Sequence, residues 1–141
     1  MKFLMLAAAV LVMPFQANND RFNGVWIAQL EGRTFVRLEL ASANGTPTGR
    51  IGTGNIHVND RGEVEEATDV PAQLTPMSDI VVHDSTMAFT RVEGSELEHF
   101  ELRLRPDGTA EIEFLPSAEL LREMKEEGIP AMKPIRLTKA R

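Results

Sequence analysis

Apolar residues recur at every second position along most of the chain, which is the periodicity of β-strands. Phe100, Leu102 and Leu104 alternate with charged residues, so they would lie together on one face of a strand. A Pro-Asp-Gly turn at residues 106–108 follows, because proline fixes the first turn angle and glycine accepts the left-handed one. The alternation resumes beyond this turn, so the pattern predicts two paired antiparallel strands.

The rest of the chain shows the same pattern, with turns such as Asn44-Gly45 between the apolar runs. Residues 59–79 are the exception, because they are acidic and interrupted by Pro71 and Pro76. We expect a long loop there, with room for one poor edge strand. The segments expected as strands are residues 22–30, 34–40, 50–58, 80–83, 86–92, 97–104, 110–114 and 135–137.

One helix is predicted near the C-terminus. Ser117 is a suitable N-cap, and Gly128 ends the helix. Leu120, Leu121 and Met124 fall on one side of it, and most other positions are charged. We expect a surface helix that packs on the sheet or closes one end of a barrel. The alternative is a lid over a ligand.

A meander of short strands protects its edges by closing into a barrel or a sandwich. We therefore predict an all-β fold, an antiparallel up-and-down barrel or half-open barrel of about seven or eight strands with one surface helix. The inward positions would either line a ligand site or fill a solid core. Our candidates for these positions are Val36, Leu38, Phe89, Phe100, Leu102, Ile112 and Phe114.

Residues 1–17 have the plan of a secretory signal peptide, with Lys2, an apolar run over residues 3–13 and the small residue Ala17. The run is too short for a bilayer span, which needs about 20 residues. Cleavage after Ala17 would leave residues 18–141 as a single domain without a membrane span. The chain has no cysteine, so it lacks the disulfides of many secreted eukaryotic domains. We expect a secreted or periplasmic bacterial protein.

The chain resembles the lipocalins and the wider calycin group of β-barrels. Phe22-Asn23-Gly24-Val25-Trp26 opens the first expected strand, and Arg136 lies on the last. In that group a Gly-x-Trp begins the first strand, and a basic residue from the final strand covers the tryptophan. The resemblance implies a barrel in which Gly24, Trp26 and Arg136 are structural. Arg141 is the alternative covering cation. The resemblance implies no catalytic residues.

Other residue patterns give little support to an enzyme or a metal site. His57, His83 and His99 lack the short spacing of metal-ligand motifs, and His99 should point outward. No serine has a Gly-x-Ser-x-Gly frame, and cysteine is absent. We therefore expect no enzymatic activity, no cofactor and no metal. A net charge of −6 also disfavours nucleic acid as a partner.

Two functions remain from the sequence. The first is a non-enzymatic extracytoplasmic protein that binds a small hydrophobic ligand inside the barrel. The second is a protein-interaction or inhibitor module of the bacterial envelope, with a filled barrel and the acidic loop 59–79 as its contact surface. An open cavity of about 300 Å³ or more would favour the ligand. The methionines either line that pocket or fill the core, and they are Met77, Met87, Met124 and Met132.

Overall fold

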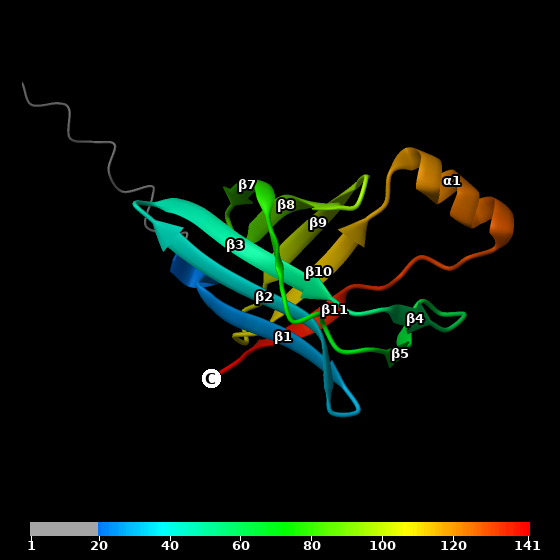
Figure 1. Ribbon diagram of the computed structural model, residues 1–141, viewed down its shortest axis with the longest axis horizontal. Coiled ribbons are helices and arrows are strands. Elements are labelled where there is room, and N and C mark those ends of the chain that lie inside the picture. The colour runs from blue at the N-terminus through cyan, green and yellow to red at the C-terminus, as the bar shows by residue number, and fades with distance from the viewer. Residues whose placement is uncertain (1–19) are drawn as a thin grey trace, which may run out of the picture.

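The computed structural model describes residues 20–141, and the predicted signal peptide lies outside the described residues. A nine-stranded antiparallel sheet curls into a nearly closed β-barrel, which confirms the predicted all-β fold (Figure 1). A two-stranded hairpin and one helix lie outside the large sheet. The strands of the large sheet are β1 (Gly24–Leu30), β2 (Arg33–Ala43), β3 (Thr46–Thr53), β6 (Thr75–Pro76), β7 (Ser78–His83), β8 (Thr86–Glu93), β9 (Glu96–Leu104), β10 (Ala110–Leu115) and β11 (Ile135–Lys139).

The barrel is held together by sheet pairing between the first and last strands of the chain. The order of the strands is β6-β3-β2-β1-β11-β10-β9-β8-β7. The two outer strands, β6 and β7, are separated in sequence by Met77 alone. One extended segment, residues 75–83, therefore pairs first with β3 and then with β8. Met77 continues the pairing with β3, because its N–H donates to the Gly49 carbonyl at 2.9 Å.

The alternation of the sequence decides which side chains enter the barrel. On β9, Phe100 and Leu102 are buried, whereas Glu101 and Arg103 form an ion pair on the opposite face. Burial of the apolar face is the main source of stability for such a sheet. At one end of the interior the packing is tight, and we name it the filled end. Its side chains are at most 3% exposed, and they include Phe22, Trp26, Leu102 and Leu137.

The segment between β3 and β6 differs from the prediction. The expected strand 50–58 is broken after Thr53, and the chain re-forms as β4 (Ile56–Val58) in a separate hairpin with β5 (Val64–Ala67). A Cβ atom at Gly54 would lie 1.9 Å from the Thr68 carbonyl oxygen, so only glycine allows this backbone approach. The expected loop 59–79 thus contains β5, β6 and the start of β7.

The helix α1 (Ala118–Glu127) begins and ends as predicted. The Ser117 hydroxyl accepts a hydrogen bond from the Leu120 N–H at 3.1 Å, and Gly128 ends the helix with a φ of 69°. None of the helical residues is buried, and Leu120 and Leu121 are 38% and 43% exposed. The helix therefore stands away from the strands (Figure 1), instead of packing on the sheet or closing the barrel.

Candidate binding cavity

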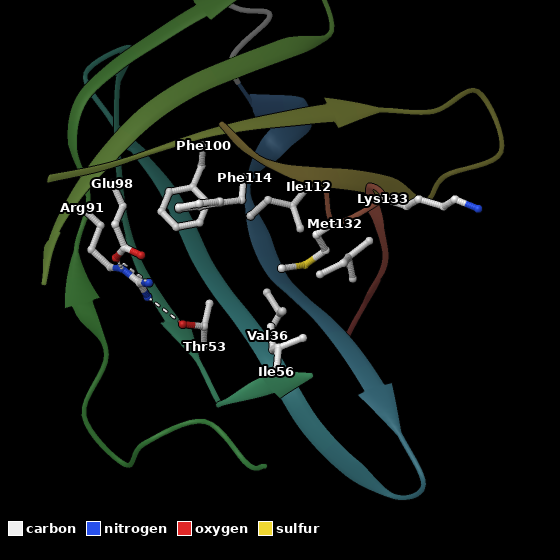
Figure 2. Close-up of a pocket in the computed structure, with 11 residues that line it drawn as sticks. Val36, Thr53, Ile56, Arg91, Glu98, Phe100, Ile112, Phe114, Met132 and Lys133 are labelled. Carbon is white, nitrogen blue, oxygen red and sulfur yellow. Dashed lines mark hydrogen bonds and ion pairs between the residues drawn. The ribbon is translucent and has the colours of Figure 1, made fainter. Parts of the chain in front are cut away.

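A cavity of about 210 Å³ lies inside the barrel, at the end opposite the filled end. We name this the cavity end. Figure 2 shows the lining side chains, which come from strands of the barrel, from β4 and from the segment before β11; most of them point toward a common space, whereas the Lys133 side chain points away from it. Most of the wall is hydrocarbon, and its aliphatic and aromatic members include Val36, Ile56, Ile112, Phe114, Met132 and Ile135.

Phe100 and Phe114 form an aromatic wall of the cavity, and Phe89 packs against Phe100 outside the cavity lining. Phe89, Phe100 and Phe114 are directly opposite one another on β8, β9 and β10. The Phe89 and Phe100 rings are stacked with centroids 5.2 Å apart, and Phe114 meets Phe100 edge-on at 5.5 Å. Such pairs add about 0.5–1.5 kcal/mol beyond their burial. These cross-strand contacts therefore hold the aromatic wall in place without a ligand.

A buried arginine lies at the edge of this apolar space. Arg91 is 5% exposed, and its Nε donates to Glu98 Oε1 at 2.8 Å, while Nη2 is 2.7 Å from the same oxygen. Its Nη1 donates to the Thr53 hydroxyl at 3.0 Å, and the guanidinium carbon is 5.2 Å from the Phe100 ring centroid. Burying a charge is costly unless it is paired, and here Glu98 supplies the pairing across the β8–β9 ladder.

Two segments outside the large sheet cover the cavity end. Ile56 of β4 and Met132 of the connection between α1 and β11 both line the cavity (Figure 2). The hairpin turn is bound to that connection, because the Lys133 N–H donates to the Gly62 carbonyl at 2.9 Å. A Cβ at Gly62 would lie 2.2 Å from the carbonyl oxygen of Ala131, so the two backbones are closely packed.

The same turn carries one perturbed carboxylate. Hydrogen bonding from the Asn59 side chain, followed by Arg61, lowers the pKa of Glu63 below its ordinary value. Arg61 Nε donates to Glu63 Oε1 at 2.9 Å, and Lys133 Nζ lies 4.0 Å from the other carboxylate oxygen. The ionised form of Glu63 therefore supports the contact between the hairpin and residues 131–133.

The structure divides the seven predicted interior residues into two groups. Four of them line the cavity, namely Val36, Phe100, Ile112 and Phe114. The other three are buried in the hydrophobic core and are absent from the cavity wall, namely Leu38, Phe89 and Leu102. Thr53, Arg91 and Glu98 were not predicted as interior residues, although Arg91 has the same two-residue phase as Phe89. This two-residue phase was the signal in the sequence that could have placed Arg91 in the interior.

The tryptophan is covered by a different cation from the one that the lipocalin resemblance implied. Trp26 is 3% exposed, and its indole N–H donates to the Phe22 carbonyl at 2.9 Å. Lys139 Nζ lies 5.1 Å from the centroid of the ring, so Lys139 is the covering residue in place of Arg136 or Arg141. Arg136 is exposed and lies opposite Glu111 in the ladder.

The methionines do not gather around the cavity. Only Met132 lines it, whereas Met77 and Met87 are buried in the core and Met124 is on α1. His57, His83 and His99 are all exposed, and His99 faces outward as predicted. Within residues 20–141, no group of three or more His, Cys, Asp or Glu side chains is placed to hold a metal ion.

A larger hollow of about 580 Å³ lies along the outer side of β1–β3. It includes the charged residues Glu39 and Arg50, and both are on the face that is turned away from the core. The interior cavity is smaller, but it combines apolar walls with a buried ion pair. We regard the interior cavity as the candidate site because burial strengthens both hydrophobic and polar recognition.

Comparison of the chain with protein-family models, with curated proteins and with solved structures finds no match. The structure alone therefore shows the fold, and its nearly closed antiparallel barrel is compatible with a calycin-like arrangement. In the part of the chain that the structure describes, no helix is both long and apolar enough to span a bilayer.

Proposed function

We propose that this protein is a non-enzymatic, lipocalin-like binding protein that holds one small hydrophobic molecule at the cavity end of its barrel. The observation that carries the proposal is the apolar cavity of about 210 Å³ inside a barrel that is otherwise well packed. Apolar side chains at Val36, Ile112 and Phe114 would contact the ligand. Burial of the ligand's surface in such a cavity would provide most of the binding free energy.

The volume limits the size of the ligand. Pockets for drug-sized molecules are about 300–1,000 Å³, whereas an apolar cavity of about 150 Å³ is sufficient for benzene. A cavity of about 210 Å³ therefore suits a single ring with a short substituent, or a short branched chain. Haem and long fatty acids are too large for it. The volume is also below the value of about 300 Å³ at which an open cavity was expected to favour ligand binding.

The polar groups in the cavity support a binding role over a catalytic one. Arg91, Glu98 and Thr53 bind one another, and this arrangement holds the guanidinium in place. A catalytic base needs a nucleophile or a substrate proton within hydrogen-bond reach. The three histidines are exposed and do not line the cavity, so they do not supply such a base.

The proposal includes an extracytoplasmic location. It is supported by the charge, apolar run and small residues of positions 1–17. Expression of the full chain in a bacterium with N-terminal sequencing of the exported product tests this part. We expect the mature product to begin at Asn18, and retention of residues 1–17 on a cytoplasmic product would contradict it.

A thermal-shift screen of the purified protein tests ligand binding. A ligand at 100 times its dissociation constant adds about 2.7 kcal/mol to the free energy of unfolding. We expect single-ring compounds to raise the melting temperature, and long fatty acids, haem and large hydrophobic dyes to have no effect. The Ile56→Phe variant should lose the response because the larger side chain occupies the cavity. Ile80→Phe is the matched control, since Ile80 is also half-buried but lies outside the cavity wall.

The filled end favours a second candidate function, a protein-interaction or inhibitor module. Side chains such as Phe22, Trp26 and Leu137 leave no room for a ligand where they pack, so they act as a rigid scaffold. This function would hold if no apolar compound of any size stabilised the protein. The contact surface would then be on the outside, and the acidic segment 59–79 was the region expected from the sequence.

A further inference from the structure

The ion pair inside the cavity indicates what chemical class of ligand the site accepts. We infer that the cavity selects an uncharged ring compound with one hydrogen-bond acceptor, such as a carbonyl oxygen, and rejects carboxylates. This inference rests on the proposed function. It goes further because it assigns a specificity to Arg91 and Glu98, whereas the proposed function needs only the apolar wall.

The charge of Arg91 is already balanced before a ligand enters. Glu98 Oε1 lies within 2.8 Å of both Nε and Nη2, and the Glu93 carboxylate lies 3.2 Å from Nε. Two carboxylates thus surround one guanidinium. A negative charge on a ligand would be repelled chiefly by Glu98, whose side chain is 21% exposed and lines the cavity, whereas the repulsion from Glu93, at 60% exposure, is screened by solvent.

The guanidinium still has donor capacity for an uncharged acceptor. Arginine has five N–H bonds. Glu98 occupies the Nε hydrogen and one on Nη2, and Thr53 occupies one on Nη1. At least two N–H bonds are therefore left without an acceptor among residues 20–141. Because Arg91 lines the cavity, a ligand carbonyl or hydroxyl oxygen could accept from one of them, and a buried donor gains from being satisfied.

The rest of the wall supplies the second half of the specificity. Phe100 holds the guanidinium over its face, and Phe114 and Ile112 extend the hydrocarbon surface away from it. Lys133 also lines the cavity, but its ammonium group points away from it, so a ligand meets one polar corner and an otherwise apolar wall (Figure 2). A ring with a single acceptor group matches this distribution, because a second polar group would face hydrocarbon and remain unpaired.

Three ring compounds that differ in one substituent test the inference by calorimetry. They are ethylbenzene, acetophenone and benzoate. We expect acetophenone to bind at least tenfold more tightly than benzoate, and more tightly than ethylbenzene. If benzoate binds as tightly as acetophenone, this inference is overturned while the proposed function stands. If none of the three binds and the thermal-shift screen is also empty, the proposed function fails, and this inference fails with it.

The Glu98→Gln variant tests the role of the ion pair directly. Glutamine keeps an acceptor oxygen for Arg91 but removes the negative charge. We expect the ratio of the benzoate to the acetophenone dissociation constant to fall at least tenfold. Glu101→Gln is the matched control on the same strand, because Glu101 pairs with Arg103 on the outer face. An unchanged ratio in folded Glu98→Gln overturns the inference.

A second variant covers the case in which Glu98→Gln fails to fold. Replacement of both partners, as Arg91→Met with Glu98→Met, removes the two charges together, and such exchanges are often neutral or stabilising. We expect the preference of this double variant for acetophenone over ethylbenzene to fall at least tenfold, because the guanidinium is gone and the Thr53 hydroxyl is the donor that stays in the cavity corner. An undiminished preference for acetophenone would overturn the assignment of Arg91 as the specificity-determining residue.

Discussion

The two ends of the barrel interior are built on the same strands, but they differ in what the inward positions carry. At the filled end, Trp26, Leu102 and Leu137 are bulky and almost fully buried. At the cavity end, the inward positions of β3, β8 and β9 include Thr53, Arg91 and Glu98, which bind one another. The ion pair holds these side chains at the cavity's edge, where an apolar side chain could collapse into the space.

This difference indicates a division of labour within a small barrel. Hydrophobic burial scales with the apolar area that is removed from water, so we expect the fully buried side chains of the filled end to contribute more stability per residue than those of the cavity wall. The cavity end gives up packing contacts, and cavity-lining atoms lose dispersion partners on one side. Loss of stability at a binding site is common because the site must leave room for its ligand. Substitution of matched residues at the filled end and at the cavity end tests this difference.

The largest effect is expected from truncation of a core residue outside the cavity. Leu102 and Ile112 are opposite each other on β9 and β10, and both are buried, but only Ile112 lines the cavity. Leu102→Ala should lower the free energy of unfolding by about 2–5 kcal/mol. Ile112→Ala should cost clearly less, because part of its surface already faces a void. Urea denaturation measures both, and equal losses would contradict a functional distinction between the two sides.

Enlargement of the same two residues should again destabilise the protein more at Leu102 than at Ile112. Leu102→Phe adds volume to a tightly packed region and should cost about 1–3 kcal/mol. Ile112→Phe directs the added volume into the cavity, so it should be less destabilising and should also abolish ligand stabilisation. Denaturation curves with and without acetophenone test this. A larger loss of stability for Ile112→Phe would show that the cavity is closed in solution.

The interior residues could be predicted because the side-chain period of a strand is two. Six of the seven candidate residues are buried and Phe114 is half-buried. The cavity could not be predicted, since its walls come from segments that are far apart in sequence. Ile56 is on the hairpin and Met132 precedes β11, and the alternation along one strand does not place either of them. The break after Thr53 depends on a backbone approach between Gly54 and Thr68 that requires the fold.

Charged residues were the other failure of the sequence argument. Charged residues are usually expected in water, so Arg91 and Glu98 were not predicted inside the barrel although both alternate in phase with buried neighbours. The same phase rule identifies the cation over Trp26. Leu137 is buried on β11, and Lys139 shares its face whereas Arg136 does not. The place of a residue in the two-residue alternation therefore predicts the direction of its side chain better than its charge does, provided that a buried charge has a partner.

A moderate effect is expected from removal of the cation at the filled end. Lys139→Met keeps the aliphatic stem but removes the ammonium group that lies over Trp26. A cation–π contact at an exposed site contributes about 0.5–1 kcal/mol, so we expect a loss of that size. Arg136→Met is the matched control on the same strand and should change stability by less than about 0.5 kcal/mol. Thermal denaturation followed by tryptophan fluorescence distinguishes them, and a larger loss for Arg136→Met would restore Arg136 as the covering residue.

The smallest effect is expected at the contact that covers the cavity end. The pKa of Glu63 is lower in the folded protein than in the unfolded chain, so the ionised carboxylate stabilises the folded protein. This stabilisation is fully present above the unfolded pKa, and it is lost as the pH falls through the folded pKa. As the pH falls below the ordinary pKa of a glutamate, the hairpin should therefore loosen from residues 131–133 before the barrel unfolds. Hydrogen exchange at the Lys133 amide, which donates to Gly62, would report this loosening. Glu63→Gln should raise that exchange rate at neutral pH and remove its acid dependence, whereas Glu65→Gln on β5 should leave both unchanged. Protection that is independent of pH in the native protein would show that the backbone contact alone holds the cover in place.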